Sequence, residues 1–168
     1  MDQLNRLNEL PEPEATAEFL KCCGSRTWAQ RMTESRPFAN LEELHKRATE
    51  LWWSVESADW LEAFRSHPKI GGKKATAEVS RQSQSWSSQE QSEIARADVS
   101  TLGELARLNR EYEEKFGYIF IVCATGKSSE EMLAILKSRI GSVPNDELRV
   151  AAAEQAKITE IRLRKLME

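Results

Sequence analysis

Apolar side chains recur every three or four residues along most of the chain, and this spacing predicts a series of helices. In the first half of the chain, residues that stop or cap helices interrupt the pattern. Gly24 and Ser25 separate two segments, Arg36-Pro37 ends the second, and Asn40 is suited to cap a longer third one. The helices expected here are residues 14–23, 26–36, 41–55 and 57–67.

Residues 69–87 break this pattern, because they contain two glycines and many small polar side chains. We expect an extended or weakly helical loop here, and a loop of that length in a compact domain is usually functional. The helical pattern returns at Ser87 or Ser88, either of which is suited to cap a helix over Glu90 to Ala97.

One long helix is expected from Leu102, because an apolar stripe continues from there to Phe120 at helical spacing. The run YIFIVCA at 118–124 would suit a buried strand equally well. We interpret it as the buried end of the helix, since no second convincing strand could pair with it. Gly117 lies inside this pattern at a cost of about 1 kcal/mol relative to alanine, which indicates a packing or site role.

Two further helices are expected, one opened by Ser128 and one running from Pro144 to the end of the chain. The 7 glycines and 5 prolines among 168 residues are too few for a turn-rich all-β protein. A chain of this length fits one domain. The sequence therefore predicts an all-α fold, a single compact domain over residues 1–168 with about eight or nine helices.

Composition and charge exclude several classes of protein. No apolar run is long enough to cross a membrane, and the first residues lack the layout of a secretory signal. A net charge of −3 lacks the basic patch of a nucleic-acid binder. The three cysteines, at 22, 23 and 123, have no metal-ligand spacing and are typical of buried thiols in a reducing compartment. We expect a cytoplasmic protein that binds neither membranes nor nucleic acid.

The chain has two histidines, and His67 is the stronger candidate for chemistry. It precedes Pro68, which pushes it out of the helical region and displays the imidazole at a chain reversal. An imidazole titrates near neutral pH and can act as a general acid or base. Position alone favours the plainer interpretation, in which His67 only caps the preceding helix. His45 lies in a charged helical stretch and is expected to be solvated.

Two other features could bind an anion. A helix start at Ser87–Gln91 would offer unpaired N–H groups, and Glu90 could orient a substrate or a catalytic histidine. An ordinary capping box between Ser87 and Glu90 explains the same residues. Arg162 lies in an apolar stripe near the C-terminus, where its guanidinium could clamp a carboxylate or could extend outward from the core edge.

In combination, these motifs resemble one family. His67-Pro68 followed by Ile70-Gly71, then Ser87-x-x-Glu90-Gln91, then Asn109-x-x-Tyr112-x-x-Lys115-Phe116-Gly117 resembles the OHCU decarboxylases. The resemblance implies an all-α homodimer without metal or organic cofactor. It also implies a lyase of urate degradation, which decarboxylates the small ureidoimidazoline 2-oxo-4-hydroxy-4-carboxy-5-ureidoimidazoline (OHCU) to S-allantoin.

The resemblance also implies a set of site residues. The catalytic pair would be His67 and Glu90. The substrate contacts would be Pro68, Ser87, Ser88, Gln89, Glu90, Gln91, Phe120, Ile121, Val122, Cys123, Ala124 and Arg162, with the stretch from Phe120 to Ala124 acting through backbone groups. The chain departs from the family pattern at Ile119, where many members have proline, and at Thr125, where many have arginine.

Two alternatives stay open on sequence grounds. A non-catalytic helical interaction module would use His67 and Glu90 only as caps and the segment 69–87 as its binding surface. An enzyme of the same shape acting on a related ureido or imidazolone acid would share all the motifs. Substrate range separates that enzyme from an OHCU decarboxylase.

Overall fold

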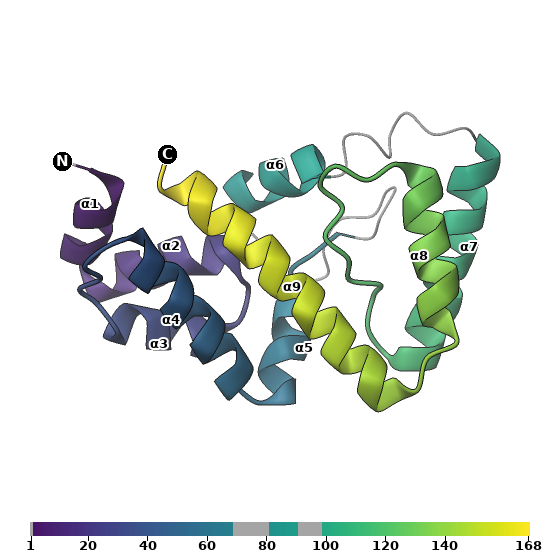
Figure 1. Ribbon diagram of the computed structural model, residues 1–168, viewed down its shortest axis with the longest axis horizontal. Coiled ribbons are helices and arrows are strands. Elements are labelled where there is room, and N and C mark those ends of the chain that lie inside the picture. Colours follow the sequence, from purple (N-terminus) through teal and green to yellow (C-terminus); the bar gives the residue numbers. More distant parts are fainter. Residues whose placement is uncertain (1, 69–80, 91–98) are drawn as a thin grey trace. The chain divides into compact units, whose positions relative to one another are not determined.

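The computed structural model describes residues 2–68, 81–90 and 99–168, and every regular element in these ranges is an α-helix (Figure 1). The helices are α1 (Gln3–Glu9), α2 (Glu12–Cys22), α3 (Arg26–Glu34), α4 (Leu41–Ser54), α5 (Ser57–Arg65), α6 (Arg81–Glu90), α7 (Val99–Phe116), α8 (Ser129–Ile140) and α9 (Pro144–Leu166). The predicted all-α class is confirmed. No helix in the described part of the chain is long and apolar enough to cross a membrane.

The chain divides into two compact units, which are described separately. Unit 1 comprises residues 1–63 and 156–168, and unit 2 comprises residues 64–155. The helices α1 to α4 belong to unit 1, and α6 to α8 belong to unit 2.

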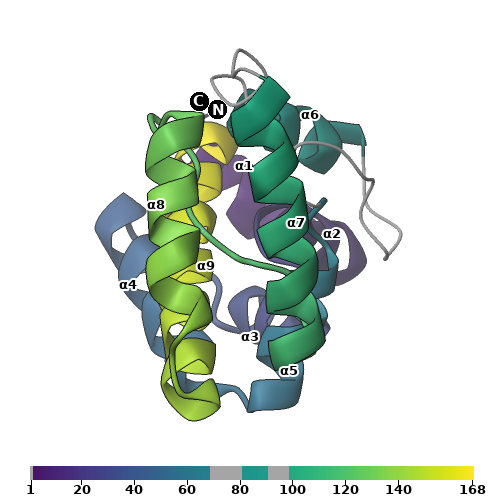
Figure 2. The same cartoon turned by 90° about the vertical axis from the view of Figure 1, so that its right-hand side faces the viewer.

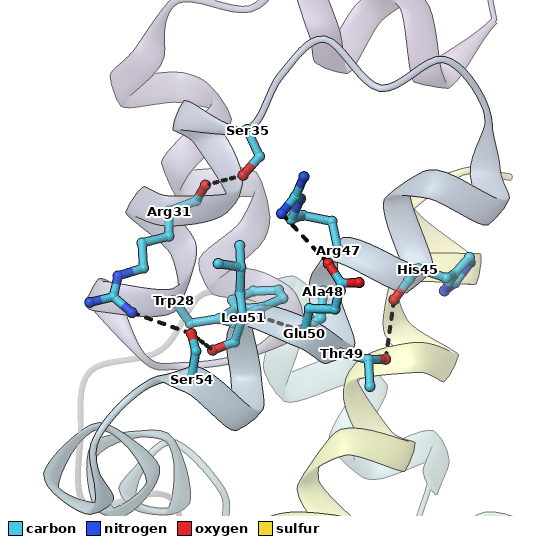
Figure 3. Close-up of polar contacts among 10 residues, drawn as sticks. All are labelled: Trp28, Arg31, Ser35, His45, Arg47, Ala48, Thr49, Glu50, Leu51 and Ser54. Carbon is cyan, nitrogen blue, oxygen red and sulfur yellow. Dashed lines mark hydrogen bonds and ion pairs between the residues drawn. The ribbon is translucent and has the colours of Figure 1, made fainter.

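In unit 1 the predicted helix caps are confirmed. The Ser25 side chain accepts a hydrogen bond from the Trp28 backbone N–H, and the Asn40 side chain accepts one from Glu43. The fully buried Trp28 donates its indole N–H to the Ala48 carbonyl at 3.0 Å, which joins α3 to α4 (Figure 3). These bonds satisfy buried polar groups and fix both helices around an apolar core.

His45 differs from its expected solvated state. Its ring is partly buried beside a cavity of about 20 Å³ lined by α4 and the C-terminal part of α9, and burial lowers its pKa. Its Nδ1 atom is buried without a hydrogen-bond partner among the described residues. Figure 3 shows the ring on the side of α4 that faces α9. The sequence pattern missed this because α9 is far away along the chain.

In unit 2, α7 and α8 lie side by side and run in the same direction (Figures 1 and 2). The connection over 117–128 therefore has to return along the helices before α8 begins. Seven residues cover about 23 Å when extended but only about 10 Å as a helix. The connection between two parallel helices thus favours extended backbone over 118–124.

The expectation that 118–124 continues the helix is wrong. α7 ends at Phe116, and Gly117 has φ +84°, a conformation that favours glycine. Beyond it, Phe120, Val122 and Ala124 pack into the core of unit 2 with α7 and α8. This alternation is the period of an extended chain. The segment is neither helix nor strand, because it packs between helices with no strand beside it among the described residues.

The expectation that a helix begins at Ser87 or Ser88 is also wrong. α6 spans Arg81–Glu90, so both serines lie in its second half, and most of this helix falls in the region predicted as loop. The buried face of α6 carries Ser83, Trp86 and Ser87 at helical spacing. Two of these three side chains are hydroxyls, and an apolar periodicity could not reveal them. The remainder of the predicted loop, 69–80, and most of the predicted helix 90–97 lie outside the described residues.

Candidate active site

His67 lies just beyond the end of α5, and its ring is held by a residue that sequence reasoning missed. Its backbone N–H donates to the Phe64 carbonyl at 3.2 Å, which closes the last turn. Its Nε2 atom lies 2.6 Å from Oε1 of Gln155 on α9. The ring is 8% exposed and Gln155 is fully buried. His67 is thus more than a helix cap, because its side chain makes a buried hydrogen bond far along the chain.

The signal for Gln155 was present in the sequence. It occupies the inward stripe of α9 between the buried residues Ala152 and Ile158, where an apolar side chain is the rule. A fully buried amide needs hydrogen-bond partners, so a glutamine at such a position indicates a polar partner from elsewhere in the fold.

Glu90 is the last residue of α6 and is partly buried. Ser87 is buried in the preceding turn, whereas Ser88 and Gln89 are exposed, and Gln91 lies outside the described residues. A helix C-terminus carries a partial negative charge and no unpaired N–H groups. The anion-binding helix start inferred for Ser87–Gln91 is therefore wrong, because the described residues of this set, 87–90, lie at the end of a helix.

Glu90 acts electrostatically on the segment 120–124. The pKa of the Cys123 thiol is raised, first by burial and further by the negative charges of Glu154 and Glu90. The charge of Glu90 thus acts on Cys123, within the segment that the family resemblance assigns to substrate binding. The raised pKa also excludes Cys123 as a ready nucleophile near neutral pH.

The segment 120–124 is held along one edge by three side chains. Arg139 donates to the Ile121 carbonyl at 2.6 Å, Glu154 accepts from the Cys123 N–H at 3.2 Å, and Lys127 donates to the Cys123 carbonyl at 2.7 Å. In an extended chain, the N–H and C=O of Val122 point to the opposite edge. Within the described ranges neither of these two Val122 groups has a hydrogen-bond partner. This edge presents a donor and an acceptor side by side, the pattern that a ureido group complements.

Arg139 is itself fixed by a buried network. Its Nε donates to Oε1 of Glu147 at 2.8 Å, and the Tyr112 hydroxyl donates to the same oxygen at 2.5 Å. Glu147 and Tyr112 are fully buried, and burial is the first cause of the raised pKa of Tyr112. The guanidinium also lies 4.6 Å from the centre of the Phe120 ring. Sequence reasoning missed Arg139 and Glu147, because Glu147 stands in the first turn of α9, where acidic residues are usual.

The motif Asn109-x-x-Tyr112-x-x-Lys115-Phe116-Gly117 has scaffold roles in this structure. Asn109 donates to the Leu105 carbonyl inside α7, and Lys115 donates to the Ile140 carbonyl at 2.7 Å, which caps the end of α8. Gly117 then ends α7. These contacts place the start of the connection that carries residues 120–124.

Arg162 is buried in unit 1 rather than extended into solvent. Its side chain is 2% exposed, and its Nη1 lies 3.4 Å from the Lys21 carbonyl. Its positive charge partly offsets the effect of burial, which raises the pKa of the Cys22 thiol. His67, Glu90 and residues 120–124 belong to unit 2. The role of Arg162 as a carboxylate clamp stays a prediction.

All three cysteines are free and buried. Burial raises the pKa of Cys23 to about 11, so this thiol is protonated near neutral pH. The interpretation of the cysteines as buried thiols is confirmed. Pro68, which follows His67 directly, is partly buried.

Comparison with known proteins identifies the class. The family model of OHCU decarboxylase matches residues 8–164. The chain is 41% identical over 150 residues to the uric acid degradation bifunctional protein TTL of Arabidopsis thaliana, a match that covers 89% of this chain and 46% of that protein. It is 30% identical over 168 residues to the 2-oxo-4-hydroxy-4-carboxy-5-ureidoimidazoline decarboxylase of Amia calva, covering 100% and 94% of the two chains.

A solved structure shows the same fold. A crystal structure of OHCU decarboxylase in the presence of (S)-allantoin superposes with a TM-score of 0.76 at 41% identity, covering 90% of this chain and 97% of that one. The chain belongs to the OHCU decarboxylase family. It spans less than half the length of the Arabidopsis protein, whose name records two functions.

Proposed function

We propose that this protein catalyses the cofactor-independent decarboxylation of OHCU to S-allantoin in urate degradation. The observation that carries the proposal is the family match over residues 8–164. The relatives named above are OHCU decarboxylases or proteins of uric acid degradation, and the matched crystal structure was obtained with the proposed product. The contacts of His67, Glu90 and the segment 120–124 are compatible with this chemistry.

The reaction breaks the bond between the ring carbon and the carboxylate, releases carbon dioxide and leaves an electron pair on the ring carbon. The adjacent unsaturated ring system can take up these electrons, so the step needs no separate electron sink. A proton must then be delivered to one face of the intermediate to give a single enantiomer. The enzyme has to orient the substrate, stabilise the developing anion and control that proton.

The residues divide these tasks. His67, held in place by its hydrogen bond, handles the proton at the developing anion, and Glu90 assists it. The Val122 N–H and C=O bind an amide-like part of the substrate, within the predicted contact stretch from Phe120 to Ala124. Pro68, the side chains of Ser87, Ser88, Gln89 and Gln91, and Arg162 complete the proposed contacts.

The test uses circular dichroism to follow S-allantoin while urate oxidase and the following hydrolase generate OHCU in the cuvette. The wild-type protein is expected to accelerate loss of the intermediate and to yield optically active product. His67→Asn should lower kcat/KM by about 10²–10⁴-fold, the usual contribution of a general acid or base. Glu90→Gln should lower it in the same direction.

The control is His45→Asn, which changes the other histidine and should leave turnover unchanged. Slow racemic allantoin with wild-type protein would refute the decarboxylase and favour the helical interaction module. Faster turnover of a related ureido or imidazolone acid would favour the other enzyme. Unaltered turnover by His67→Asn would leave the activity standing and remove His67 from it.

We also propose that the protein is a cytoplasmic homodimer. The free cysteines support a reducing compartment. The family resemblance supports the dimer, and exposed apolar side chains are available for a contact, among them Val143 at 62% and Val150 at 43% exposure. Val143 directly precedes α9, and Val150 lies near the start of that helix.

A further inference from the structure

We propose that Gln155 is a positioning residue that holds His67 as the tautomer with its proton on Nε2, so that Nδ1 carries the lone pair of the neutral ring. The inference rests on the proposed function for its catalytic consequence, whereas the tautomer itself can be tested without any substrate. The supporting contact is the 2.6 Å distance between His67 Nε2 and Gln155 Oε1.

The chemistry of the two groups sets the direction of this hydrogen bond. An amide oxygen accepts hydrogen bonds and cannot donate one, so Nε2 must carry the hydrogen. In a neutral imidazole the other nitrogen then holds the lone pair. The tautomer of a histidine is generally decided in this way, by the hydrogen bond that one of its nitrogens makes.

The fold gives Gln155 little freedom to turn away. Its side chain is 0% exposed, and Ala151 and Ala152, one turn earlier on α9, are equally buried, so all three lie on the inward face. If the Gln155 amide turned away from the ring, its buried oxygen would need another hydrogen-bond partner, and a buried polar group without a partner is unfavourable. The hydrogen bond therefore constrains both the proton and the ring plane of His67.

A glutamine differs from a carboxylate in this position. A carboxylate beside Nε2 would favour the imidazolium and raise the pKa of the histidine. The uncharged amide orients the ring without that added charge. A neutral imidazole held in this way can accept a proton on its other nitrogen, which suits a group that must handle a proton during turnover.

The direct test is nitrogen NMR of the imidazole rings in the intact protein, at a pH where both are neutral. The chain has only two histidines, and His45→Asn assigns the remaining signals to His67. The expected spectrum shows hydrogen on Nε2 and an unprotonated Nδ1. Hydrogen on Nδ1 of His67 would overturn the proposal, whatever the activity of the protein.

Kinetics provide a second test with two variants of the same residue. Gln155→Met removes the acceptor and should lower kcat by about 10- to 100-fold, the scale seen when an orienting partner of a functional histidine is lost, with less change in KM. Gln155→Glu keeps an acceptor oxygen and should retain more activity. It should also move the acidic limb of the pH profile of kcat/KM to higher pH, because the carboxylate raises the pKa of His67.

The matched controls are Gln30→Met and Gln30→Glu, at an exposed glutamine of α3, which should leave the pH profile in place. Far-UV circular dichroism verifies that each variant folds. A Gln155→Met protein that folds and retains wild-type kcat would overturn the positioning role, as would a pH profile unmoved by Gln155→Glu. An inactive wild type with the Nε2–H tautomer would instead refute the decarboxylase and leave the tautomer established.

Discussion

At the scale of single residues, two glycines in and beside α7 have different backbone conformations. Gly103 lies inside this helix, is exposed, and would have nothing within 4 Å of an added Cβ. Gly117 has equal space around it, but its φ of +84° lies in the region that side chains disfavour. The role of Gly117 is therefore one of backbone conformation rather than packing.

The two glycines predict opposite effects of the same substitution. Gly117→Ala should lower the free energy of unfolding by about 1–2 kcal/mol, the cost of a left-handed conformation. Gly103→Ala should raise it by about 0.5–1 kcal/mol, because alanine loses less backbone entropy in a helix. Urea denaturation followed by circular dichroism measures both values. Equal effects at the two positions would contradict the conformational explanation.

At the scale of elements, the ion pair between Arg139 and Glu147 joins α8 to α9, and Tyr112 extends the network to α7. All three side chains are buried, and Nη1 of Arg139 donates to the Ile121 carbonyl. A buried pair contributes little net stability when both charges are taken out of water, but loss of one partner leaves the other charge uncompensated. The network therefore places the connection between the helices more than it stabilises them.

Two variants separate these effects. Arg139→Met leaves the buried Glu147 carboxylate without its positively charged partner. It should lower the free energy of unfolding by about 3–5 kcal/mol. The double variant Arg139→Met/Glu147→Gln removes both charges and keeps an acceptor for Tyr112, so it should recover a large part of that loss. Urea denaturation measures both.

The control is Arg107→Met in α7, where the exposed pair with Glu111 is expected to contribute about 0.2–1 kcal/mol. A double variant no more stable than Arg139→Met alone would show that the uncompensated charge of Glu147 does not cause the lower free energy of unfolding.

At the scale of the whole molecule, the proposed homodimer makes a prediction about mass. Light scattering after size exclusion should give twice the chain mass of 19.2 kDa. Val150→Lys would place a charge on the exposed valine pair at the start of α9 and should weaken the dimer, whereas Val99→Lys, at another exposed valine, should not. A monomeric wild type would refute the dimer and leave the activity to be judged separately.

The limits of sequence reasoning follow from distance along the chain. Ser25, Asn40 and Ser128 were predictable caps because a cap and its helix are neighbours in sequence. α6 was placed wrongly because its buried face is made largely of serines, which carry no apolar signal. The apolar run 118–124 was buried as expected, but its conformation depends on where α8 begins in space.

The sequence by itself determined the all-α class, most helix boundaries before residue 66, the family and the candidate residues His67 and Glu90. Local periodicity and short motifs are sufficient for these, because they involve neighbours along the chain. Only the tertiary structure decided that Gln155 holds the His67 ring and that Arg139 holds the Ile121 carbonyl. Such contacts join residues 88 and 18 positions apart, and burial, which makes them strong, arises only when the helices pack.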